Sequence, residues 1–387
     1  MHMLSKLSAA AALVGTASAW LPEGKIRGVN LGTLFIYEPW IDNGEWSSMG
    51  CDGQKSEFDC VSSLGQDAAD AAFQKHWQSW LTTGDLDEIK SYGLNTIRIP
   101  VGYWFKEDLV DSSEHFPKGG LDALTSFVGA ASDRGLYVIM DLHGGPGAQE
   151  ANQPFTGQNA PEAGFYNDYN YGRAVEWLRW MTELVHTKDE FRGVGMIELI
   201  NEPLHGGDSV ETMRSKYYPD ALNAIREVES NLGVSDDKAV HVQMMSSLWG
   251  SGNPNEFLPD ARGPTSYDDH RYLKWDTSVT VDKDAYIKES CGDDRTADGE
   301  DHIIVGEWSI SVPDDVEGSA DWSPSGNADF YKKWFAAQVQ TYERSAGGWV
   351  FWTWKAALND PRWSYKDAVD AGIIDKDIQA VLDSQVC

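Results

Sequence analysis

Two glutamates, far apart in the chain, have the surroundings that hydrolysis of a glycosidic bond requires. Glu202 lies in an Asn-Glu-Pro segment at the end of one apolar run, and Glu307 lies in Gly-Glu-Trp at the end of another. Hydrolysis with retention of configuration needs a protonated carboxyl group as acid/base and a carboxylate as nucleophile, about 5–5.5 Å apart. If the ends of the two runs meet in space, we expect Glu202 to be the acid/base and Glu307 the nucleophile.

Further functional side chains stand at or near the ends of other apolar runs. They are Asn30, Arg98, His143, Asn201, His270, Tyr272 and Trp352. Because an arginine is always cationic, Arg98 is expected to lower the pKa of the nucleophile, whereas partial burial and the negative partner keep the pKa of the acid high. Taken singly, Arg98 has an alternative interpretation as a surface ion-pair donor, and His143 as a buried, hydrogen-bonded imidazole. Their joint occurrence at successive run ends favours one active site.

A metal-dependent hydrolase is the rival enzyme class. Such an enzyme would use carboxylates together with several histidine ligands. His143 and His270 stand alone, without a His-x-His or Glu-x-x-His pattern. The sequence therefore predicts no metal site and no cofactor.

The elements that would position these residues are short apolar runs separated by helical periodicities. Apolar residues recur with helical spacing over residues 121–131, 175–185 and 330–342. Strands buried on both faces are typical of a parallel sheet. Eight of them alternating with helices predict an α/β fold, a (β/α)8 barrel that forms one catalytic domain over residues 20–387. The predicted strands are 26–32, 94–100, 136–143, 194–203, 240–245, 266–272, 302–308 and 348–354.

Two of these expectations have alternatives. The sixth run, SYDDHRY, is polar enough to be a loop. A doubly wound open sheet is the alternative architecture, but no Gly-x-Gly-x-x-Gly segment follows the first run.

The N-terminal segment and the charge bear on location and partners. Residues 1–19 combine Lys6, a short apolar stretch and Ala17-Ser18-Ala19, which predicts a cleaved signal peptide and a secreted, extracellular protein. The formal charge of −30 disfavours binding to nucleic acid or anionic lipid. After residue 19 the sequence has no uninterrupted stretch of about 20 apolar residues, so we expect no membrane span. A neutral polysaccharide suits such a surface, and we expect a monomer.

The four cysteines make an even count in a chain predicted to be secreted, which favours disulfides over metal ligation. Three connectivities are possible. We favour Cys51–Cys60 with Cys291–Cys387, because the second bond would tie the C-terminus to the barrel.

Aromatic residues near the predicted barrel mouth are candidates for sugar contacts. Trp249 follows the fifth run and Trp308 follows Glu307, so both are expected to face the mouth. The long loop 144–171 after the third run holds five aromatic residues, which either stack on glucose rings or pack against one another.

The ordered set of strand-end residues resembles the family 5 glycoside hydrolases. The resemblance spans nearly the whole chain after residue 19, and it implies that Asn201 binds the substrate 2-hydroxyl and that Trp352 forms the floor of the −1 sugar site. It also implies that Tyr272 and Arg98 hold the nucleophile and that His270 supports the acid/base. These roles come from the resemblance and not from spacing.

Within that family the chain is similar to the fungal β-glucanase branch, as the segments GVNLGTLFIYEPW, DLHGGPGAQ and GWVFWTWK indicate. By this resemblance Glu38 lines the −1 pocket. The segments around WSSMGCDGQKSEFDC and FTGQNAPEAGFY favour an endo-β-1,6-glucanase that acts on fungal cell-wall β-glucan. An exo-β-1,3-glucanase is the alternative. A non-catalytic glucan-binding wall protein is a third reading, but it would be expected to lack Glu202 or Glu307.

Overall fold

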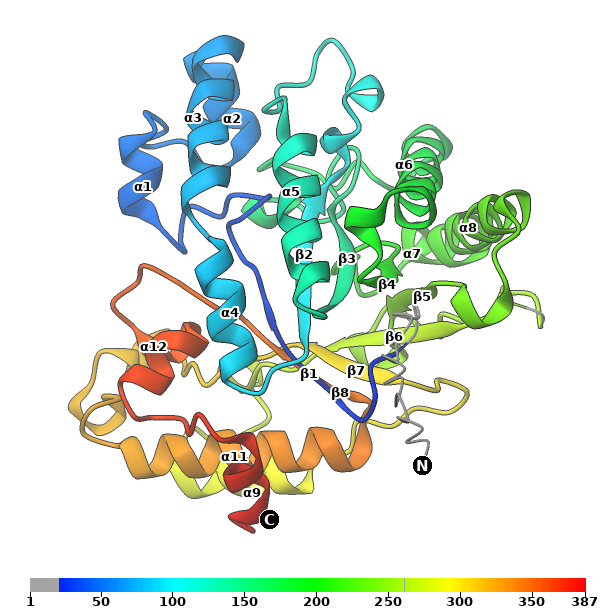
Figure 1. The fold of residues 1–387 in the computed structure, drawn as a ribbon. Helices are drawn as coiled ribbons and strands as arrows, with labels where there is room; N and C mark the ends of the chain where they lie inside the picture. The colour runs from blue at the N-terminus through cyan, green and yellow to red at the C-terminus, as the bar shows by residue number, and fades with distance from the viewer. Residues whose placement is uncertain (1–20, 261) are drawn as a thin grey trace, which may run out of the picture.

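Eight parallel strands form a closed barrel in the order of the chain. The computed structural model describes residues 21–260 and 262–387, and its strands pair in sequence until β8 closes on β1 (Figure 1). The predicted (β/α)8 barrel is confirmed, including the polar sixth strand. The strands are β1 (Ile26–Asn30), β2 (Thr96–Gly102), β3 (Tyr137–Gly144), β4 (Val194–Glu198), β5 (His241–Met245), β6 (Thr265–His270), β7 (Ile303–Glu307) and β8 (Gly348–Phe351).

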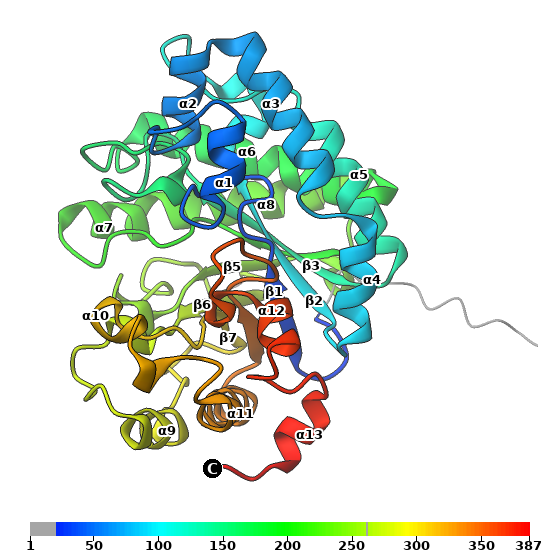
Figure 2. The same ribbon diagram turned by 90° about the vertical axis from the view of Figure 1, so that its left-hand side faces the viewer.

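Helices surround the barrel. In Figure 2, α3 to α5 cover one side, and α9 and α11 cover another. Between β5 and β6 the described residues contain only a short helical turn, Ser247–Trp249. The helices are α1 (Asn43–Ser48), α2 (Glu57–Leu64), α3 (Gln66–Ser79), α4 (Thr83–Ser91), α5 (Gly120–Asp133), α6 (Asp168–Thr187), α7 (Asp208–Thr212), α8 (Tyr218–Leu232), α9 (Lys283–Gly292), α10 (Asp314–Glu317), α11 (Ala328–Ser345), α12 (Tyr365–Asp370) and α13 (Ile378–Asp383).

Two glycines turn the chain from a helix into the next strand. Gly93 follows α4 with φ 79°, and Gly135 follows α5 with φ 67°. This left-handed conformation costs glycine little because it has no Cβ, and it ends each helix just before β2 or β3. The three predicted helical periodicities correspond to α5, α6 and α11.

The barrel interior changes from apolar to charged along its axis. Alternate residues of β3 point inward, so Tyr137 and Ile139 lie near the N-terminal end, and Asp141 and His143 follow toward the mouth. The apolar end is a small buried cluster formed by Ile26, Tyr137, Ile139, Met196, Ile304 and Val350. Above this cluster lie Arg98 and three fully buried carboxyl groups, which support the site described below.

Both predicted disulfides are present. Cys51–Cys60 joins the chain just after α1 to α2, and Cys291–Cys387 joins residue 387 to α9. The predicted signal peptide, residues 1–19, lies outside the described residues. Among the described residues, no helix is long and apolar enough to cross a membrane.

Candidate active site

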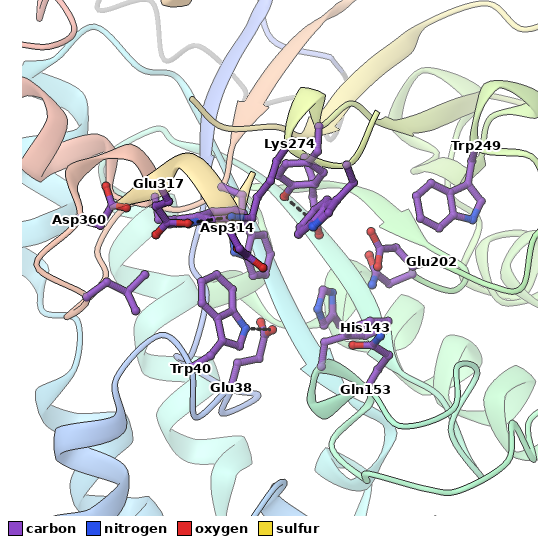
Figure 3. Close-up of a pocket in the computed structure, with 18 residues that line it drawn as sticks. Glu38, Trp40, His143, Gln153, Glu202, Trp249, Lys274, Asp314, Glu317 and Asp360 are labelled. Atoms are coloured by element: carbon purple, nitrogen blue, oxygen red, sulfur yellow. Dashed lines mark hydrogen bonds and ion pairs between the residues drawn. The ribbon is translucent and has the colours of Figure 1, made fainter. Parts of the chain in front are cut away.

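A pocket of about 650 Å³ lies at the C-terminal ends of the strands. Its volume is within the range of small-molecule sites. Figure 3 shows Trp249 and Glu202 on one side, and Trp40, Asp314, Glu317 and Asp360 on the other. Eight of the residues predicted from the sequence line the pocket, namely Glu38, His143, Asn201, Glu202, Trp249, Tyr272, Glu307 and Trp352.

The two glutamates face each other across one end of this pocket. An oxygen of Glu202, an oxygen of Glu307 and a ring nitrogen of His270 all lie within 4.8 Å of one another. Glu307 ends β7, whereas Glu202 lies four residues beyond β4 with φ 38°, a strained value for a residue with a Cβ. The predicted strand 194–203 is therefore too long, because the chain leaves the sheet after Glu198.

Glu307 is held by two donors and is almost completely buried. Arg98 Nη1 donates to Oε1 at 3.0 Å, and the hydroxyl of Tyr272 donates to Oε2 at 3.0 Å. Burial raises the pKa of Glu307, and the negative charge of Glu202 adds to this, while His270 and Arg98 act in the opposite direction. Arg98 lowers the pKa of Glu307, as expected from the sequence, but the cost of burying the charge is larger, so the net change is upward.

Arg98 lies inside the barrel and not on the surface. Its guanidinium donates to Oδ1 of Asn30 at 3.0 Å and to Oδ1 of Asn201 at 2.7 Å. It also lies 2.8 Å from Glu198 and 3.1 Å from Asp141. The planar fork of donors thus fixes residues from β1, β2, β3 and β4 relative to Glu307.

Two further side chains of the described residues present unpaired polar atoms to the pocket. His143 is oriented by Asp141, whose Oδ2 lies 2.6 Å from Nδ1, and it stacks on Trp352 with ring centres 5.7 Å apart. Within residues 21–260 and 262–387, neither Nε2 of His143 nor Nδ2 of Asn201 has a hydrogen-bond partner. A buried polar atom without a partner is costly, and a substrate hydroxyl would satisfy either atom, because it can accept a hydrogen bond from the Asn201 amide or donate one to the His143 ring.

Glu38 is a third carboxyl group at the pocket. It is 5% exposed, and Trp40 Nε1 donates to its Oε2 at 2.8 Å. Burial raises the pKa of Glu38 to about 7, although His143 and Trp40 act to lower it. A carboxyl group in this state exchanges hydrogen bonds with sugar hydroxyls either as a donor or as an acceptor.

Trp308 does not lie where the sequence analysis placed it. Its side chain is fully buried and packs against Phe335, Tyr342, Trp349 and Phe351 outside the barrel. Trp308 directly follows Glu307, the last residue of β7, and its side chain points to the opposite side of the sheet, as alternation along a strand predicts. The interpretation of Trp308 as a sugar contact is wrong.

The aromatic residues of loop 144–171 have mixed roles. Phe155 lines the pocket beside His143. Phe165 and Tyr171 are buried and pack against Tyr217, while Tyr169 is exposed and bonded to Asp111. The loop is therefore packed largely by its own aromatic residues, with one member at the site.

The pocket wall opposite Glu202 is formed mostly by residues that were not predicted from the sequence. Trp40, Trp275 and Trp363 form an aromatic cluster there, with Trp275 61% exposed. These residues come from loops after β1, β6 and β8, where no periodicity indicates direction. Of these three residues, Trp40 alone could have been predicted from the sequence, because it lies two residues after Glu38 in the Glu-Pro-Trp segment. The other missed lining residues are Gln153, Lys274, Asp314, Glu317, Leu358 and Asp360.

One cluster of the described residues has atoms close enough to hold a metal ion together, and it consists of Glu202, His270 and Glu307. Arg98 already donates to Glu307, and a guanidinium repels a second cation at the same carboxylate. Nδ1 of His270 is hydrogen-bonded to Glu202 at 2.7 Å, and its Nε2 lies on the far side of the ring, 3.5 Å from Asp268. The donor set thus fits a proton-transfer site better than a metal centre.

A closed parallel barrel whose mouth brings two carboxyl groups within 5 Å, one of them bound by a guanidinium, has the architecture that glycoside hydrolysis with retention requires. The chain belongs to glycosyl hydrolase family 5, because residues 61–358 match the family described as Cellulase (glycosyl hydrolase family 5).

Relatives support this membership. A protein of Emericella nidulans named glucan endo-1,6-beta-glucosidase B is 57% identical over 374 residues, which cover 96% of this chain and 90% of the relative. A probable glucan endo-1,6-beta-glucosidase B of Neosartorya fischeri is 55% identical over the whole of both chains. A probable glucan 1,3-beta-glucosidase A of the same species is 29% identical, covering 93% of this chain and 90% of the relative. Among solved structures, rutinosidase from Aspergillus niger has the same fold, with a TM-score of 0.71, 19% identity, and coverage of 91% of this chain and 98% of the other.

Proposed function

We propose that this protein is a secreted endo-β-1,6-glucanase that cleaves fungal cell-wall β-glucan by a double-displacement mechanism. The observation that carries the proposal is the facing pair of Glu202 and Glu307 within 4.8 Å, at the mouth of a barrel of glycosyl hydrolase family 5. This separation suits direct attack by one carboxylate, since an inverting enzyme needs more room for a water molecule.

In the first displacement, an oxygen of Glu307 attacks the anomeric carbon and forms an ester. The bond from this carbon to the leaving oxygen breaks, and Glu202 gives that oxygen its proton. In the second displacement, Glu202 takes a proton from water as the water oxygen attacks the same carbon. The ester bond breaks, Glu307 is released as a carboxylate, and Glu202 is protonated again.

The remaining pocket residues have the chemistry to hold a glucosyl unit. Asn201 Nδ2, a donor, and His143 Nε2, a ring nitrogen, have no protein partner in the described part of the chain, and Glu38 adds a carboxyl group. Trp352 offers an aromatic face for stacking against a sugar ring. We assign these four residues to recognition of the sugar unit at the cleavage point.

The β-1,6 linkage rests on sequence similarity. Relatives named as endo-1,6-beta-glucosidases are 55–57% identical over nearly the full length, whereas those named as 1,3-beta-glucosidases are 29% identical. A secreted location is consistent with the two disulfides, which persist in oxidising compartments. An exo-β-1,3-glucanase remains the second candidate, because those relatives cover most of the chain.

The decisive experiment is a product profile on linear glucans. Incubation with pustulan, a β-1,6-glucan, should release oligosaccharides of mixed length early in the reaction, with the β configuration retained at the new reducing end. The E307Q variant is the control for contaminating activity. If laminarin yields only glucose while pustulan is untouched, the exo-β-1,3 candidate replaces this proposal.

A further inference from the structure

His270 has carboxylate groups against both nitrogens of its ring. Nδ1 lies 2.7 Å from Oε1 of Glu202 and 3.5 Å from Oε2 of Glu307. Nε2, on the far side of the ring, lies 3.5 Å from Oδ2 of Asp268. A neutral imidazole carries one N–H and one acceptor nitrogen, whereas an imidazolium carries two donors. Since carboxylates face both nitrogens, the doubly protonated ring fits this position best.

Asp268 is built into the barrel beneath this histidine. It precedes His270 by two residues on β6, so both side chains point into the barrel, and Asp268 is completely buried. Its Oδ2 also lies 3.5 Å from Nε of Arg98. On β7 the chain has Gly306 at the point nearest this carboxylate, and a methyl group there would overlap Oδ1 of Asp268. The nucleophile strand therefore leaves room for Asp268.

The charges around His270 come from all sides of the barrel. Burial acts against the charge, but the carboxylates of Glu307 and Asp268 and the hydrogen bond to Glu202 raise its pKa well above the usual range. Burial likewise opposes ionisation of Asp268, yet the charges of His270 and Arg98 lower its pKa. The titratable groups that face this pair are Glu202 after β4, Glu198 on β4, Glu307 on β7, Tyr272 after β6 and Arg98 on β2, while Asp269 on β6 points away from it and acts only through its charge.

We propose that Asp268 is a positioning residue that keeps His270 doubly protonated, so that the Nδ1 hydrogen always points at Glu202. The inference rests on the proposed role of Glu202 as acid/base. When Glu202 gives its proton to the leaving oxygen, the new carboxylate accepts the Nδ1–H hydrogen bond, which stabilises its charge. A neutral ring with its acceptor at Nδ1 would instead take a hydrogen bond from the Glu202 carboxyl group and compete with the substrate for the proton.

Asp269 provides a matched control because it is the next residue on the same strand. It is also buried, but its side chain points out of the barrel and accepts a hydrogen bond from Arg295 Nη1 at 3.1 Å. D268N and D269N thus remove one negative charge each at adjacent buried positions, and only the first position faces His270.

The first measurement uses the wild-type protein labelled with ¹⁵N-histidine, with H270Q to assign the His270 signals. The two ring nitrogens have similar chemical shifts in an imidazolium and very different ones in a neutral ring. We expect the imidazolium pattern from pH 5 to pH 8 in wild type and D269N, and its loss within this range in D268N. A neutral His270 in wild type at pH 6, or an unchanged pattern in D268N, would overturn the inference.

The second measurement is the pH profile of kcat/KM on pustulan. In D268N, His270 loses its proton at a lower pH than in wild type, and the alkaline limb should follow it. We expect this limb to move down by about one pH unit, which is about a tenfold loss of rate on that side of the profile. In D269N the limb should stay in place, whereas a shift of equal size in both variants would contradict a specific role for Asp268. If D268N fails to fold, the wild-type spectrum is the test by itself. An imidazolium whose Nε2 hydrogen exchanges slowly with water would support the contact with Asp268, and a neutral ring at pH 6 would overturn the inference. The spectra do not depend on the substrate, so an inactive protein with an Asp268-dependent imidazolium would refute the proposed function and would still show that Asp268 keeps His270 doubly protonated.

Discussion

The hydroxyl of Tyr272 and the guanidinium of Arg98 bind different oxygens of Glu307, each at 3.0 Å. Tyr272 lies after β6 and Arg98 lies on β2, so Glu307, the proposed nucleophile at the end of β7, is fixed from both sides of the barrel. Both donors favour the ionised carboxylate, which is the form that can attack a sugar. They act against burial, which raises the pKa of Glu307.

Replacing Tyr272 with Phe should test this relationship with little change of shape. Loss of a hydrogen bond to a charged group costs about 1.5–3 kcal/mol, so kcat/KM should fall by about 10- to 150-fold. Because the lost bond favoured the ionised form, the pKa of Glu307 should rise and the acidic limb of the pH–rate profile should move to higher pH. Y267F is the control, since the Tyr267 hydroxyl bonds to Asn255. An unmoved acidic limb in Y272F would contradict the assignment of Glu307 as nucleophile.

The two glutamates should be separable by the choice of substrate. Glu307→Gln removes the attacking group, so activity should fall by several orders of magnitude on every substrate. Glu202→Gln removes the proton donor, so the loss should be large on pustulan and much smaller on an aryl β-glucoside whose leaving group needs no proton. Initial rates with both substrates, together with thermal unfolding to show intact folds, check this. Wild-type rates on pustulan in either variant would end the assignment.

The sequence predicted the barrel and the inward-facing strand ends because both follow from short-range patterns. Apolar runs separated by helical periodicities predicted the barrel, and the place of His143 at the end of the run 136–143 predicted its position at the mouth without any knowledge of loops. The prediction for Trp308 failed because side-chain alternation was not considered there. A side chain that directly follows the inward-facing Glu307 is expected to point away from the barrel interior. The lowering of the Glu307 pKa by Arg98 was expected, whereas its net rise was not, because that rise depends on the depth of burial, which spacing does not reveal.

The charged layer beneath the site was also beyond the sequence reasoning. Asp141, Glu198 and Asp268 sit two or more residues before the expected strand ends, in positions where a parallel strand usually carries apolar residues. Their role depends on Arg98, which comes from a distant strand. Similarly, the wall formed by Trp40, Trp275 and Trp363 comes from three loops whose meeting point only the folded chain defines.

Two tryptophans should respond oppositely to truncation. Trp275 lines the pocket and is 61% exposed, so Trp275→Ala should raise KM for long glucans severalfold through lost stacking while the melting temperature stays nearly constant. Trp308 is fully buried, so Trp308→Ala should lower the free energy of unfolding by about 3–5 kcal/mol. Michaelis–Menten kinetics and chemical unfolding on the two variants provide the comparison. A stability loss in W275A equal to that in W308A would show that Trp275 is a structural residue.

Removal of divalent metal ions should leave the activity unchanged. The carboxylates of the proposed pair are already matched by Arg98 and His270, so the reaction needs no cation. Dialysis against a strong chelator, followed by rates on pustulan with and without added Zn²⁺ or Mg²⁺, measures this. Activity that disappears on dialysis and returns with one metal would favour the metal-dependent class.

The buried carboxyl group of Glu57 should make stability fall as the pH rises. Glu57 begins α2, is 1% exposed, and accepts a hydrogen bond from the backbone N–H of Tyr37 at 2.7 Å, next to Glu38 of the pocket. Burial raises its pKa from 4.5 to about 8. Between these values the unfolded chain releases the proton while the folded protein keeps it, so the contribution present below pH 4.5 is lost by about pH 8.

Glu57→Gln keeps an acceptor for the Tyr37 N–H and stays neutral at every pH. The variant should therefore lose less stability than wild type between pH 4.5 and 8, by up to about 5 kcal/mol at the alkaline end, since each pKa unit corresponds to about 1.4 kcal/mol. Urea unfolding of both proteins at a series of pH values gives the difference directly. Glu162→Gln, at an exposed position, should change stability by less than about 0.5 kcal/mol throughout. Parallel stability curves for E57Q and wild type would mean that Glu57 is not buried as a protonated group.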